Sequence, residues 1–160
     1  MTEQTTRGAA SEREIVIERT IQARPERIFG AYTDPQLVAR WWAPPGSSLR
    51  VEQMDVRPGG RYRYVQRSAD GRELVFVGSY LEVRPTTRLV YTFEIEGQGN
   101  PVTTTVELHE EGASTRVTLT NVCGSKEVRE MMVEYGAPAG AMAALAQLAK
   151  LLEVPERGSP

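Results

Sequence analysis

The chain is poor in the side chains that form disulfides and bind metals. It has one cysteine, Cys123, and one histidine, His109. A single cysteine excludes an internal disulfide, and a single histidine excludes multi-histidine metal sites such as HExxH. No apolar run approaches the 18 residues of a membrane-spanning helix, and residues 1–11 lack the apolar stretch of a secretory signal. We therefore expect a cytoplasmic protein with no cofactor, no metal site and no membrane contact.

The charge is nearly balanced. The 160 residues include 19 basic and 21 acidic side chains, for a net charge of −2. Proteins that bind nucleic acids usually carry a basic excess, so no nucleic-acid partner is expected. Hydrophobic residues make up 40% of the chain and charged residues 25%, which is typical of a globular domain. We expect disordered tails over 1–12 and 154–160 on either side of one domain over 13–153.

The first half of the pattern predicts a strand and two short helices. Residues 14–21 (EIVIERTI) are rich in β-branched side chains and alternate between two faces. Pro25 and the pair Asp34-Pro35 then stand where helices can begin. Six further segments alternate or are bounded by turn residues, which predicts strands in hairpin succession over about 49–56, 61–67, 74–83, 89–95, 102–109 and 115–119.

The end of the chain is helical by pattern. An apolar stripe runs from Val128 to Leu152, with Ser125 as the expected N-cap. Residues 136–140 (GAPAG) interrupt the stripe, and Pro138 should kink or break the helix there. The stripe keeps its phase across the break, so both halves should lie on the same sheet. Strands and helices are segregated, which predicts an α+β fold with a curved antiparallel sheet around a long, kinked C-terminal helix.

Four segments resemble those of a known family: IVIERTIQARPERIFGAYTDPQLVARWWAPPG at 15–46, DVRPGGRYRYVQR at 55–67, GSYLEVRPTTRLVYTFE at 78–94 and EYGAPAGAMAALAQLAKLLE at 134–153. In this order they resemble the START-like (SRPBCC, Bet v-like) helix-grip superfamily, and within it the domain related to the activator of the heat-shock-protein-90 ATPase. The resemblance implies an apolar cavity between the sheet and the long helix. No catalytic residue of a cyclase relative maps onto residues 121–125.

A cavity of this kind would bind a small apolar ligand. Its candidate ligand-binding residues are aromatic or methionine side chains on the inward faces of the strands and helices: Trp41, Trp42, Tyr62, Tyr64, Phe76, Tyr80, Tyr91, Phe93, Met131 and Tyr135. The same side chains would also serve as ordinary core. One indole of the Trp41-Trp42 pair is expected at the cavity mouth, or else one is buried and one lies at the rim.

Three functions stay open at this point. The first is non-enzymatic binding of a small hydrophobic or amphipathic ligand. The second, implied by the resemblance alone, is a co-chaperone that interacts with the heat-shock protein 90 ATPase as a partner. The third is a polyketide cyclase or hydrolase, for which Asp55, Tyr80 and Glu82 are the candidate acid or base groups.

Other features favour structural roles. His109 should face solvent, and Cys123 should be a buried, unreactive thiol. The strand at 74–83 is apolar on both faces, so either the short helices or a homodimer contact should cover one of them.

Overall fold

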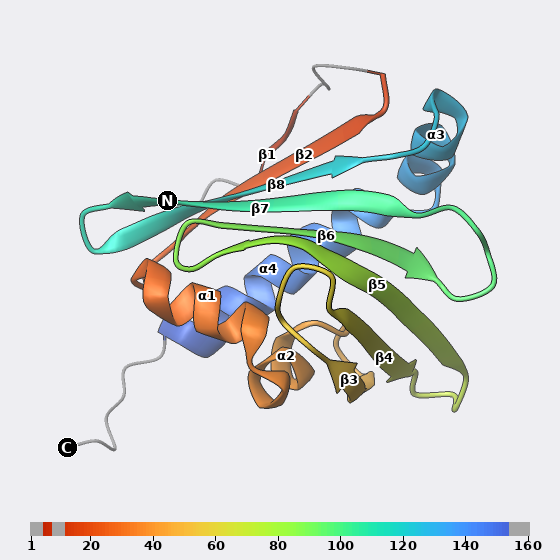
Figure 1. Ribbon diagram of the computed structural model, residues 1–160, viewed down its shortest axis with the longest axis horizontal. Coiled ribbons are helices and arrows are strands. Elements are labelled where there is room, and N and C mark those ends of the chain that lie inside the picture. The colour runs from red at the N-terminus through yellow and green to blue at the C-terminus, as the bar shows by residue number, and fades with distance from the viewer. Residues whose placement is uncertain (1–4, 8–11, 154–160) are drawn as a thin grey trace.

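An antiparallel sheet of eight strands forms the body of the protein (Figure 1). The computed structural model describes residues 5–7 and 12–153. The strand order is β1-β2-β8-β7-β6-β5-β4-β3, so the first long strand lies beside the last one. From β3 to β8, each strand pairs with the next along the chain. This is the meander of hairpins that the sequence predicts.

The elements follow the predicted order closely. The strands are β1 (Thr5–Arg7), β2 (Glu14–Ile21), β3 (Ser48–Met54), β4 (Arg61–Arg67), β5 (Glu73–Arg84), β6 (Arg88–Ile95), β7 (Val102–Glu111) and β8 (Ser114–Val122). The helices are α1 (Pro25–Thr33), α2 (Pro35–Trp41), α3 (Lys126–Glu134) and α4 (Ala137–Glu153). Both predicted caps are present: Asp34 accepts a hydrogen bond from the Gln36 amide and Ser125 one from the Val128 amide.

The sheet carries two register irregularities. One lies between Val51 and Gln53 in the β3–β4 pair, and the other between Tyr80 and Glu82 in the β5–β6 pair. An extra residue on one strand bends that strand and increases its twist. These irregularities therefore help the sheet to curl around its buried face.

Helix α4 lies on the concave face of the sheet, behind the strands in the view of Figure 1. Leu145, Leu148, Ala149 and Leu152 are its buried residues. Gln147 fixes the helix to the end of α2, because its side-chain amide donates hydrogen bonds to the carbonyls of Trp41 and Ala43 at 2.7 and 2.6 Å. The packing confirms the predicted helix-grip architecture.

The C-terminal helix breaks within the predicted segment 136–140, at Gly136 and not at Pro138. Gly136, between α3 and α4, has a φ of +84°, a left-handed conformation that glycine adopts without steric cost. Pro138 instead lies in the first turn of α4, where its missing N–H is not needed. Helix α3 has no buried residue and lies at the end of the sheet (Figure 1), so only α4 grips the concave face.

Part of the segment expected to be a disordered tail pairs with the sheet. Thr5–Arg7 forms β1, which is antiparallel to β2. The rest of the expected tails, apart from Glu12, lies outside the described residues. In the described part of the chain, no helix is both long enough and apolar enough to cross a membrane.

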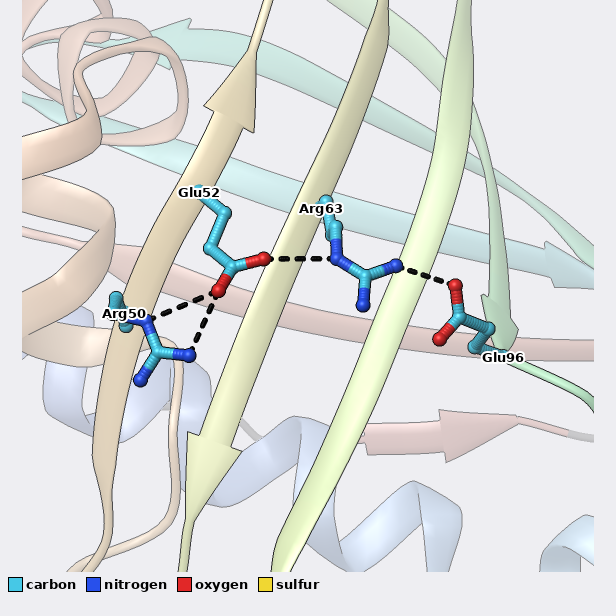
Figure 2. Close-up of polar contacts among 4 residues, drawn as sticks. All are labelled: Arg50, Glu52, Arg63 and Glu96. Atoms are coloured by element: carbon cyan, nitrogen blue, oxygen red, sulfur yellow. Dashed lines mark hydrogen bonds and ion pairs between the residues drawn. The ribbon is translucent and has the colours of Figure 1, made fainter.

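The convex face of the sheet carries rows of ion pairs. In one row, Glu52 of β3 accepts hydrogen bonds from Arg50 and Arg63, and Arg63 also donates to Glu96 (Figure 2). The hydrogen bonds from Arg50 and Arg63 lower the pKa of the Glu52 carboxyl. Such pairs on an exposed sheet give little stability but keep the face hydrated. Leu81 of β5 interrupts this surface at 52% exposure, and the homodimer contact stays a prediction.

Candidate ligand-binding cavity

A cavity of about 270 Å³ lies between α4 and the concave face of the sheet. The sheet contributes inward-facing residues of β2, β7 and β8 on one side and of β4, β5 and β6 on the other. The end of α2 and the first half of α4 close the space. The cavity therefore stands where the resemblance implies it.

Small side chains on α4 leave this space open. Ala137, Gly140, Ala141 and Ala144 all line the cavity, and their spacing of i, i+3, i+4 and i+7 places them on one helical face. In the second half of the helix the buried residues are mostly leucines, which fill the equivalent space against the sheet. The cavity thus lies under the half of α4 that lacks large side chains.

Aromatic rings form one wall. Trp42 meets Phe76 and Phe93 with ring centroids 5.0 and 5.8 Å apart, and the two phenylalanine rings stack on each other at 5.3 Å. Trp42 is half-buried, whereas Trp41 is 2% exposed and donates its indole N–H to the Ala31 carbonyl at 2.9 Å. Trp41 is therefore a core residue that reaches the cavity, and Trp42 keeps surface for a ligand.

Polar side chains line the cavity from β7 and β8. The Thr104 hydroxyl donates to the Asn121 side-chain carbonyl at 2.8 Å, and the Asn121 amide donates to the Ile15 carbonyl at 3.4 Å. Tyr32 and Tyr91 also line the cavity, and burial raises the pKa of both phenols well above its usual value. These two side chains are consequently neutral hydrogen-bonding groups at any physiological pH.

Among the described residues, the ionisable side chains of the cavity wall are the phenols of Tyr32 and Tyr91. Among the described residues that line the cavity there is no aspartate, glutamate, histidine, lysine, arginine or cysteine. In the described part of the chain, no three histidine, cysteine, aspartate or glutamate residues come together as a metal site. The arrangement can enclose an apolar body and hydrogen-bond to a neutral polar group.

Five of the ten sequence-predicted site residues line the cavity: Trp41, Trp42, Phe76, Tyr91 and Phe93. Tyr62, Tyr64 and Tyr80 do not line it but pack together beside it, with ring centroids of Tyr62 4.7 Å from Tyr64 and 5.6 Å from Tyr80. The Tyr62 hydroxyl is already bonded to the Thr92 carbonyl at 2.6 Å.

The two helix residues of the prediction lie elsewhere. Met131 is not part of the cavity wall, and its neighbour Met132 is. Tyr135 follows the last residue of α3 and is 82% exposed, so it faces solvent and not the cavity. The error arises because the break at Gly136 turns α3 out of line with α4, while the prediction carries one apolar stripe through both helices.

Several cavity residues escaped the prediction. Ile15, Ile17, Thr104, Leu119 and Asn121 line the cavity from β2, β7 and β8. Their inward alternation is visible in the sequence, but they look like ordinary core or surface positions there. The small face of α4 is the feature of the sequence that could have indicated the cavity, because four small residues at helical spacing leave space against the sheet.

The acid and base candidates for an enzyme do not converge. Asp55 pairs with Arg57 at 2.8 Å on the surface, and Glu82 pairs with Arg84 and Arg88. Tyr80 is buried among other tyrosines, where burial raises its pKa to about 12. None of the three lines the cavity.

The two remaining reactive side chains have the predicted surroundings. His109 is exposed on β7. Cys123 is 1% exposed, its sulfur lies 3.7 Å from that of Met132, and burial raises the pKa of the thiol. Neither lines the cavity.

Solved structures show the same fold. Protein CV1439 of Chromobacterium violaceum is 27% identical, with 91% of this chain and 100% of that chain covered and a TM-score of 0.77. Protein Ms6760 of Mycobacterium smegmatis is 25% identical over 94% and 98% of the two chains, with a TM-score of 0.84. A protein from Arthrobacter aurescens, 21% identical over 95% and 92%, has a TM-score of 0.88 and shows the fold alone.

The family is shown by sequence as well. A comparison with curated proteins found no match. The model of the family described as "Activator of Hsp90 ATPase homolog 1-like protein" matches residues 22–153, from the end of β2 to the end of α4. The matched residues include α2, the aromatic wall and the small face of α4. The chain therefore belongs to the activator of Hsp90 ATPase homolog 1-like family, within the helix-grip fold class.

Proposed function

We propose that this protein binds a small apolar or amphipathic molecule, without chemical change, in the cavity under α4. The observation that carries the proposal is the cavity itself: about 270 Å³, walled by aromatic and aliphatic side chains, with few polar groups. Binding sites for small molecules are typically concave and mostly apolar, with a few polar groups that fix orientation. The cavity has room for a compound of two or three rings.

The composition of the wall favours an apolar occupant. Removing apolar surface of a ligand and of the wall from water is favourable by about 25 cal/mol per Å². A core selected only for stability would fill the space by enlarging Ala141 or Ala144.

The other two functions have less support. The enzyme alternative lacks a carboxylate, histidine, lysine or cysteine among the described residues of the cavity wall. The co-chaperone alternative rests on the family's description, and no surface feature of this chain adds to it. Both stay predictions, and neither is needed to explain the cavity.

Ala144 and Ala143 give a matched test of the proposal. Ala144 lines the cavity, whereas Ala143, its neighbour on α4, is exposed. The probe is N-phenyl-1-naphthylamine, an uncharged compound whose fluorescence increases in apolar surroundings. We expect it to bind the unaltered protein and Ala143→Leu equally, and to bind Ala144→Leu at least tenfold more weakly because the leucine occupies the space.

Two results would contradict the proposal. One is the absence of binding to the unaltered protein up to the solubility limit of the probe. The other is equal binding to Ala144→Leu, which would place the probe outside the cavity. Circular dichroism of both variants shows whether either substitution changes the fold.

A further inference from the structure

Three polar residues of the cavity wall lie in one row across the sheet, while Tyr32 of α1 and Gln66 of β4 line the cavity elsewhere. Tyr91 of β6 pairs with Thr104 of β7, and Thr104 pairs with Asn121 of β8. Residues in such register have Cβ atoms about 4.5–5.5 Å apart on the same face of the sheet. All three line the cavity, so a single bound molecule can contact the whole row.

The row has hydrogen-bonding capacity that the protein does not use. The Thr104 hydroxyl donates to Asn121 and keeps its lone pairs free. The Asn121 amide has two N–H groups, of which one donates to the Ile15 carbonyl. The Tyr91 hydroxyl has no hydrogen-bond partner among residues 5–7 and 12–153. Tyr91 is half-buried and lines the cavity, so this hydroxyl can bond to a ligand oxygen or to water.

The side chains around the row disfavour binding of a charged ligand. No side chain that lines the cavity in the described part of the chain carries a charge of either sign. A carboxylate or an ammonium group would lose its hydration there without gaining a counter-ion, which costs far more than burying a neutral hydroxyl.

We propose that the cavity selects uncharged ring compounds that carry a hydroxyl or carbonyl oxygen, and that the row Tyr91–Thr104–Asn121 binds that oxygen. The rings of the ligand would lie against Trp42 and the small face of α4. This inference rests on the proposed function, since it names the class of ligand for the same cavity. It adds a specificity that apolar burial alone does not supply.

Competition against N-phenyl-1-naphthylamine tests the selection with four compounds of similar size. They are 1-naphthol, 1-methylnaphthalene, 1-naphthoate and 1-naphthylmethylammonium. We expect 1-naphthol to displace the probe, and the two ions to bind at least tenfold more weakly than 1-naphthol. 1-Methylnaphthalene has no oxygen and serves as the reference for apolar burial.

Tyr91→Phe then tests the row. The substitution removes only the hydroxyl. Because one hydrogen bond is lost, we expect the affinity for 1-naphthol to fall roughly fivefold and the affinity for 1-methylnaphthalene to stay unchanged. Thr104→Val should also lower the ratio of 1-naphthol to 1-methylnaphthalene affinity. Tyr62→Phe is the matched control, because it removes a phenol hydroxyl that bonds to Thr92 and not one in the cavity wall. It should leave the ratio unchanged.

The outcomes separate the two proposals. If the probe does not bind at all, the proposed function fails and this inference fails with it. If the probe binds but 1-naphthoate competes as well as 1-naphthol, the cavity does not discriminate against ions. The inference is then overturned, while the proposed function stands. An unchanged ratio in both Tyr91→Phe and Thr104→Val would overturn it as well, since the row would then have only a structural role.

Discussion

Replacing Gly78 by alanine tests how the tyrosine layer beside the cavity is supported. Gly78 of β5 pairs with Tyr62 of β4, and the Tyr62 ring lies across it. A Cβ atom on residue 78 would stand 1.9 Å from the Thr92 carbonyl oxygen and 2.6 Å from the Tyr62 ring. The glycine is needed for this close approach of two strands and one ring.

The expected cost follows from these distances. Carbon and oxygen atoms in contact are about 3.3 Å apart, so the Thr92 carbonyl must move by more than about 1 Å or the Tyr62 ring must leave. Overpacking of this kind costs about 1–3 kcal/mol, and losing the Tyr62–Thr92 hydrogen bond adds about 1 kcal/mol. We expect Gly78→Ala to lower the free energy of unfolding by about 3 kcal/mol and Tm by about 6–12 °C.

Urea unfolding followed by circular dichroism measures the change, with Gly30→Ala as the control. Gly30 lies inside α1, and a Cβ atom there meets nothing within 4 Å. Alanine at this position should stabilise the protein by about 0.5–1 kcal/mol, because it lowers the entropy of the unfolded chain and favours the helix. Equal free energies of unfolding for Gly78→Ala and the unaltered protein would refute the reasoning. A lower free energy of unfolding in both Gly78→Ala and Gly30→Ala would refute it as well.

Three further predictions concern the cavity and the buried groups. Trp42→Ala should weaken N-phenyl-1-naphthylamine binding at least fivefold, because the variant loses part of the aromatic wall, whereas Tyr135→Ala should leave binding unchanged; a loss in Tyr135→Ala would contradict the cavity described here. Cys123 should react with a thiol reagent only after unfolding in urea, because burial hides the sulfur and raises its pKa; rapid labelling of the native protein would contradict this. Burial raises the pKa of Tyr80 to about 12, so the folded state holds a proton that the unfolded state releases above pH ~10. The urea midpoint should therefore be insensitive to this group below pH ~10 and fall above it, and a midpoint constant to pH ~11.5 would count against the buried phenol.

Much of the fold follows from local pattern. Alternation in residues 14–21 predicts β2, and the burial of Ile15, Ile17 and Ile21 follows that pattern. The capping residues Asp34 and Ser125 mark the starts of α2 and α3 where the sequence places them. Period and capping are properties of neighbouring residues, so they can be read without knowing what the element packs against.

The break in the C-terminal helix shows what local pattern leaves open, because residues 136–140 predict the interruption but not the residue at which it occurs. Pro138 is the stronger breaker by propensity, but the chain turns at Gly136. A proline in the first turn of a helix costs nothing, whereas a left-handed residue ends one. The choice between the two depends on how α4 packs on the sheet, and that packing also leaves Tyr135 in solvent.

The sequence by itself determined the order of strands and helices, the inward faces of the strands and the small residues on α4. Only the tertiary structure decided that Tyr91, Thr104 and Asn121 form one row, because that depends on the register between strands far apart in the chain. It also decided which aromatic rings border empty space and which ones pack against each other. A cavity is a volume that no residue fills, so it is set by the distances between all its walls and not by the pattern within any one of them.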